Sequence, residues 1–172
     1  TILSLSVSDT FSTAGYTEST DSDTGTANVG AEILDAIADI DVNDIDSIRV
    51  TGVCYEVISN SGHVATRTGG VSVNSTTLLT FNIVNTAGAN GCTGDTTETL
   101  TLLPGGVAYV NTQVNGFLTA LKGGGAPSLF FTGIANWASA PPPSSGDPDT
   151  FAWSVGLKFD VYYALTADIP DF

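Results

Sequence analysis

The chain has 172 residues, with 4 Lys or Arg against 18 Asp or Glu, so its formal net charge is −14. A surface this acidic has few basic side chains that could displace counterions from phosphates. We therefore exclude nucleic acid as a partner and expect no binding to anionic membranes. The length suits one domain with one core. We expect no membrane span, because no run of eighteen or more apolar residues occurs.

The first eleven residues alternate between apolar and hydroxyl side chains. Leu3, Leu5, Val7 and Phe11 share one parity, and Ser4, Ser6, Ser8 and Thr10 share the other. This period of two predicts a strand over residues 1–11 with one apolar side. Residues 12–26 are rich in Ser, Thr, Gly and Asp without apolar periodicity, so we expect a flexible tether there, followed by a single domain over residues 27–172.

The rest of the chain predicts a mainly β protein, a two-layer antiparallel sandwich with two short amphipathic helices. Residues 151–165 keep apolar side chains on one parity, whereas residues 46–58 are apolar on both and predict a central strand covered on both sides. Shorter strands are expected at 71–73, 78–84, 97–103 and 129–135. Apolar side chains recur at helical spacing from Val29 onward, which predicts a helix with Asn28 or Thr26 as its N-cap. A second apolar stripe begins at Val107 and predicts a helix that ends at Lys122.

Two cysteines, Cys54 and Cys92, are expected to form one disulfide in an oxidising compartment. The chain begins at Thr1 and contains no Met, so we expect a secreted, extracellular or cell-surface protein whose leader has been removed.

Catalytic motifs are not evident, and we expect a protein that is not an enzyme. The lone histidine, His63, lies in a turn-rich segment without a second histidine to build a metal site or a triad. Cys54 has no evident base partner, and a disulfide with Cys92 accounts for it better than a nucleophilic role.

We expect no cofactor, and calcium is the one ligand for which the sequence offers any motif-like support. An acidic run that contains Asp39, Asp41, Asp44 and Asp46 can place several carboxylates near one ion, although a solvated acidic turn is the simpler interpretation. The triplet that begins at Asn74 is a sequon, and it predicts an exposed turn and a glycosylation site.

The apolar N-terminal strand, its tether and the sandwich behind it resemble the extracellular filament subunits of bacteria and archaea that polymerise by donor-strand exchange. The resemblance implies a secreted structural subunit that forms a filament or surface layer with other copies of itself, by adding its N-terminal strand to a neighbour. Pairing of the same strand within its own chain is the alternative that the sequence leaves open. The expected interface residues are Ile2, Leu3, Leu5, Val7 and Phe11. The closer comparison is a self-assembling family, because no Gly interrupts the apolar parity as it does in chaperone-assisted pilins.

A different class remains open beside this one. A monomeric surface module can bind calcium or carbohydrate through the acidic runs and through exposed aromatic side chains, for which Trp137 and Tyr162 are the candidates. A viral coat protein of sandwich type is a further alternative. An enzyme ranks third, behind the structural subunit and the binding module.

Overall fold

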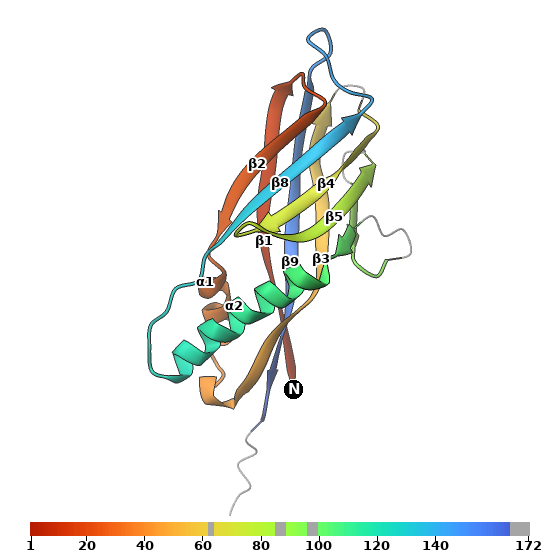
Figure 1. Cartoon of the computed structure of the whole chain (residues 1–172). Helices are drawn as coiled ribbons and strands as arrows, with labels where there is room; N and C mark the ends of the chain where they lie inside the picture. Colours follow the sequence, from red (N-terminus) through yellow and green to blue (C-terminus); the bar gives the residue numbers. More distant parts are fainter. Residues whose placement is uncertain (62–63, 85–88, 96–99, 166–172) are drawn as a thin grey trace, which may run out of the picture.

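Two antiparallel sheets face each other across one hydrophobic core, with two helices at one end (Figure 1). The structure is a computed structural model and describes residues 1–61, 64–84, 89–95 and 100–165. The first sheet has the order β1 (Ile2–Tyr16), β9 (Asp149–Tyr163), β3 (Ile45–Ser61), β6 (Asn90–Cys92). The second has the order β2 (Thr20–Ala27), β8 (Phe131–Ala140), β4 (Thr66–Val73), β5 (Thr76–Val84), β7 (Leu100–Leu102). The predicted sandwich is confirmed.

The helices form where the apolar spacing predicts them. In α1 (Val29–Ala36), the Asn28 side chain caps the first turn by accepting a hydrogen bond from the Ala31 N–H at 3.1 Å. A one-turn 3-10 helix, η1 (Val42–Asp44), leads from α1 into β3. The longer α2 (Pro104–Lys122) packs closely on β5, since a Cβ at Gly106 would lie 2.5 Å from the Cα of Leu78.

The prediction that residues 46–58 are covered on both sides is wrong, and the reason is a change of register. The pairing of β3 with β9 shifts between Val50 and Gly52, which moves the inward parity from even to odd residues. Ile48 and Val50 are therefore buried before the shift, Val53 and Val57 after it, while Glu56 is exposed. A bulge thus produces the same sequence pattern as two-sided burial.

The predicted tether over residues 12–26 is also wrong. Residues 12–16 continue β1, and residues 20–26 belong to β2, which pairs with β8 from Thr20 to Ala27. The polar composition is compatible with strands because β2 lies at the edge of its sheet and is mostly solvated. The Asp23 carboxylate also accepts a hydrogen bond from the Ser12 N–H at 2.7 Å, which joins β2 to β1.

Candidate functional site: the β1 edge and its surroundings

The N-terminal strand pairs with β9 of its own chain, in a register from Ile2 opposite Tyr162 to Tyr16 opposite Asp149. Its inward side chains are buried to different depths: Val7 and Phe11 are buried, whereas Leu3 and Leu5 are only half-buried. Phe11 joins the aromatic core through Trp153, with ring centroids 6.1 Å apart. The strand is therefore packed firmly in its second half and loosely in its first.

Ile2 is the exception among the predicted interface residues. It shares the parity of the outward serines, and its side chain is 56% exposed. The other four interface residues, Leu3, Leu5, Val7 and Phe11, contact the core as their shared parity predicts. The apolar side of β1 thus begins at Leu3.

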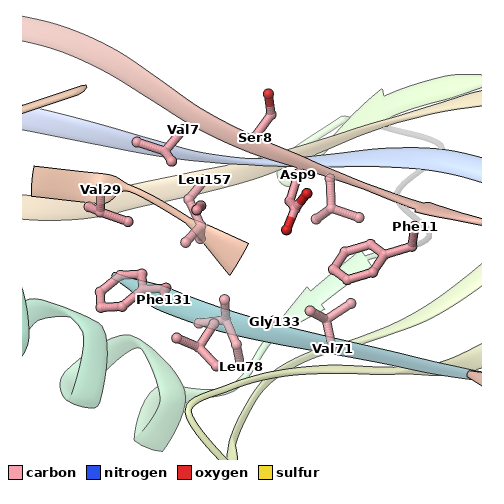
Figure 2. Close-up of a pocket in the computed structure, with 13 residues that line it drawn as sticks. Val7, Ser8, Asp9, Phe11, Val29, Val71, Leu78, Phe131, Gly133 and Leu157 are labelled. Atoms are coloured by element: carbon pink, nitrogen blue, oxygen red, sulfur yellow. The ribbon is translucent and has the colours of Figure 1, made fainter. Parts of the chain in front are cut away.

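A small apolar cavity of about 50 Å³ lies behind the middle of β1, between the two sheets (Figure 2). Its wall includes Val7 and Phe11 from β1, Val29 from α1 and Phe131 from β8. Asp9 interrupts this apolar wall and points toward the cavity in Figure 2.

The Asp9 side chain occupies the inward parity of β1, between Val7 and Phe11. Its Oδ1 accepts a hydrogen bond from the Thr10 N–H at 2.8 Å, while its buried Oδ2 has no partner among the described residues. Gly25 makes room for this carboxylate, since a Cβ there would lie 1.9 Å from Oδ2. The break in apolar parity at position 9 was the sequence signal for this feature.

The outer edge of β1 is open from Ile2 to Ser8. Thr1 and Tyr163 exchange two backbone hydrogen bonds, each 3.1 Å long, so odd-numbered residues of β1 direct their backbone groups toward β9. The backbone groups of even-numbered residues face the other way, where none of the described strands pairs with β1. In the described structure the N–H groups of Ile2, Ser4, Ser6 and Ser8 donate no hydrogen bond, whereas that of Thr10 is bonded to Asp9 and that of Ser12 to Asp23.

The opposite edge of the same sheet, along β3, is closed by side chains. Asn115 of α2 accepts from the Ile48 N–H at 3.0 Å and donates to the Ile48 carbonyl at 2.7 Å. Asn111, one turn earlier, accepts from the Val50 N–H at 2.8 Å. Further along, Thr93 accepts from the Val53 N–H at 3.1 Å and donates its own N–H to the Val53 carbonyl at 2.9 Å. The i, i+4 asparagines thus satisfy the edge in place of another strand.

A buried polar cluster anchors the far end of β1. Arg67 of β4 and Asp149 of β9 form an ion pair that joins the two sheets, and both side chains are fully buried. The Tyr16 hydroxyl donates to Asp149, lies 3.0 Å from the Ser139 hydroxyl and accepts from Arg67 Nε at 3.3 Å. Burial, together with the hydrogen bond to Asp149, raises the pKa of Tyr16 above its ordinary value of 10.0.

No sequence pattern predicts this cluster, because its members come from four strands and lie up to 133 residues apart. Arg67 also lies over the Phe151 ring, with Cζ 3.9 Å from the centroid. The ion pair, the hydrogen bonds and the ring contact together satisfy the buried guanidinium.

The predicted disulfide between Cys54 and Cys92 is confirmed. The two cysteines face each other across the β3–β6 ladder, so the bond attaches the short strand β6 to the β3 edge.

The acidic run predicted to bind calcium lies between α1 and β3. Asp39, Asp41 and Asp44 border an open surface hollow that Leu3 and Tyr163 also line, and Asp46 is exposed at the start of β3. Asp41 caps η1 by accepting from the Asn43 N–H at 2.9 Å. Within the described ranges, no three or more His, Cys, Asp or Glu side chains are placed to hold a metal ion.

The other predicted positions have different outcomes. Asn74 is exposed in the β4–β5 turn, where its side chain accepts from the Thr132 N–H at 2.9 Å and donates to the Tyr109 hydroxyl at 3.2 Å.

The expectation of an exposed Trp137 is wrong: it is 2% exposed and packs edge-on against Phe151 in the core. Tyr162 is half-buried, with Arg49 over its ring. His63 lies outside the described residues.

No family model matches the chain, and no curated protein matches its sequence. Among solved structures, a chain from Desmodium yellow mottle tymovirus aligns with 98% of this chain and 92% of its own length, at 10% identity and a TM-score of 0.27. So remote a likeness carries no functional argument. No described helix is long and apolar enough to cross a membrane.

Proposed function

We propose that the chain is a secreted structural subunit, not an enzyme, which assembles with other copies of itself into an extracellular filament or surface layer by adding its N-terminal strand to a neighbour. The observation that carries the proposal is the open edge of β1, where the outward-facing N–H groups of Ile2, Ser4, Ser6 and Ser8 have no partner among the described residues. Unpaired edges of this kind accept strands from other chains.

Two further features support this assignment. Leu3 and Leu5 are half-buried beside the open edge, so a strand added there would cover more of their apolar surface. The disulfide is consistent with an oxidising, extracellular setting.

The test is assembly of the full chain and its inhibition by its own strand. Purified protein is concentrated at neutral pH and examined by negative-stain electron microscopy and sedimentation velocity. We expect polymers, and we expect an excess of a synthetic peptide of residues 2–11 to shorten them, because the peptide competes for the acceptor edge. A scrambled peptide is the control. Protein that stays monomeric at every concentration, or polymers that the native peptide leaves unchanged, would contradict the proposal.

A further inference from the structure

The side chains along the open edge of β1 carry no charge. From Thr1 to Ser8 the side chains are apolar or hydroxyl, in a chain whose net charge is −14. The edge strand of the second sheet, β2, instead carries Asp21 and Asp23. Two copies that meet through β2 would bring like charges together, whereas two copies that meet through residues 2–8 of β1 would not.

The same segment has none of the features that usually block edge pairing. Residues 2–8 contain no Lys and no Pro, and their pairing with β9 is regular, since the only register shift of β1 comes between Ala14 and Tyr16. The first residue beyond the segment is Asp9, whose carboxyl Oδ1 already accepts the hydrogen bond of the Thr10 N–H. The available edge therefore ends at Ser8.

We propose that β1 stays paired with its own β9 and uses residues 2–8 of its outer edge to pair with the same residues of a second copy, antiparallel, about a two-fold axis. This inference rests on the proposed function and specifies its first contact. A two-fold pair closes on itself, so growth beyond the pair uses another surface.

The register follows from the unpaired groups. Antiparallel pairing of residue 2 with residue 8 and residue 4 with residue 6 uses all four outward-facing positions of both copies and places the axis at Leu5. Each such pair exchanges two backbone hydrogen bonds. Leu5 then faces Leu5 of the second copy, and Leu3 faces Val7, so the half-buried leucines extend the apolar layer across the joint.

The surroundings of β1 favour edge pairing over removal of the strand. Tyr16 is held in the buried cluster with Arg67 and Asp149, and Phe11 packs in the aromatic core. Only residues 17–19 separate β1 from β2, which leaves a short hinge for exchange. The outer edge, by contrast, can pair without breaking any contact of the described chain.

The first test uses proline at position 6. The Ser6 N–H faces outward, so Ser6→Pro keeps the ladder with β9 but removes the hydrogen bond to Ser4 of the second copy and obstructs close approach. Ser6→Ala keeps the N–H and is the matched control. By analytical ultracentrifugation we expect a dimer for the native chain and for Ser6→Ala, and a dissociation constant at least about 100-fold higher for Ser6→Pro.

A covalent staple separates edge pairing from strand exchange. Ser4 and Asp160 lie opposite each other on the outer face, with the Ser4 hydroxyl 2.7 Å from the Asp160 carboxylate, so Ser4→Cys with Asp160→Cys can fix β1 to β9. We expect the oxidised variant to dimerise like its reduced form. Dimerisation only after reduction would overturn the inference in favour of exchange, and so would a Ser6→Pro variant that is folded by circular dichroism and still dimeric.

The outcomes also distinguish this inference from the proposed function. Dimers that respond to Ser6→Pro but never grow into polymers support the edge pairing and contradict the polymer. Polymers that persist with Ser6→Pro support a structural subunit and overturn the β1 contact.

Discussion

The strands β1 and β3 both pair with β9, one on each side, yet the hydrogen bonding of their outer edges differs. Along β3, two asparagines of α2, the hydroxyl and amide of Thr93 and the strand β6 satisfy the backbone. Along the first half of β1, the described structure provides no such partner. The comparison shows that a sheet edge can be satisfied by hydrogen-bonding groups of later segments that pack beside it. Few such groups lie beside the outer edge of β1 in the described structure.

A second contrast lies within β1 itself. Its far end is held by the buried ion pair and by Phe11, while its first residues contribute only half-buried leucines. We therefore expect amides of residues 2–6 to exchange hydrogen faster than those of residues 11–16. This gradient leaves the open edge available while the strand keeps its place.

Breaking the anchored end of β1 is expected to destabilise the chain most. Asp149→Ala leaves the fully buried Arg67 guanidinium without its carboxylate, which we expect to lower the free energy of unfolding by about 3 to 5 kcal/mol. Urea unfolding followed by tryptophan fluorescence measures the change.

The matched control for this substitution removes both charges. The double variant Arg67→Met with Asp149→Leu leaves no unpaired buried charge, so we expect it to be more stable than Asp149→Ala. Equal stability of the two variants would show that the ion pair does not anchor this end.

A smaller loss is expected from opening the β6 side of the β3 edge. Replacing both Cys54 and Cys92 by Ala removes a link between residues 38 apart in sequence, which we expect to lower the free energy of unfolding by about 2 to 4 kcal/mol. Thermal unfolding of the variant and the oxidised native chain measures the loss. A change below about 1 kcal/mol would mean that the β3–β6 pairing holds without the disulfide.

Sequence patterns predicted those long strands of the first sheet that have one buried face and one solvent-exposed face. Residues 1–11 and 151–165 alternate because Val7, Phe11, Trp153 and Phe159 face the core while their neighbours do not. The pattern failed at β2, whose residues lie at a solvated edge and need no apolar parity, and at β3, where the bulge imitates two-sided burial. Alternation of apolar and polar residues indicates a strand that is buried on one face. It does not indicate a strand that is held mainly by backbone pairing at a solvated edge.

The features that decide the candidate site depend on contacts between distant residues. The disulfide could be predicted from a count of two cysteines, but the Arg67–Asp149 pair joins residues 82 apart, and the contacts of Asn115 with Ile48 join residues 67 apart. Neither leaves a local pattern in the sequence. The edge of β1 is open because the next strand, β2, pairs with β8 in the second sheet and not with β1. Composition did not predict this placement of β2.

The side-chain closure of β3 can be tested at Asn115. Asn115→Ala leaves the N–H and carbonyl of Ile48 without their partners, so we expect a loss of about 1 to 3 kcal/mol in the free energy of unfolding and new self-association through β3. Unfolding in urea and light scattering at high concentration measure the two effects. Thr112→Ala is the control, because that exposed hydroxyl donates to the Ala108 carbonyl of its own helix. A variant as stable and as soluble as the control would mean that α2 does not close this edge.

The smallest expected effect concerns the protonation of Tyr16 and appears only at high pH. Because burial and the hydrogen bond to Asp149 raise the pKa of Tyr16 in the folded chain, the unfolded chain loses this proton first. The stabilising contribution is therefore complete below pH 10 and is lost as the pH rises from 10 through the folded-state pKa. One such proton changes stability by at most about 1.4 kcal/mol per pH unit. We expect the free energy of unfolding to fall less steeply above pH 10 in Tyr16→Phe than in the native chain, with parallel curves between pH 7 and 9. Identical slopes above pH 10 would show that the Tyr16 hydroxyl is not held in the buried cluster, and the anchored end of β1 would then resemble its open end.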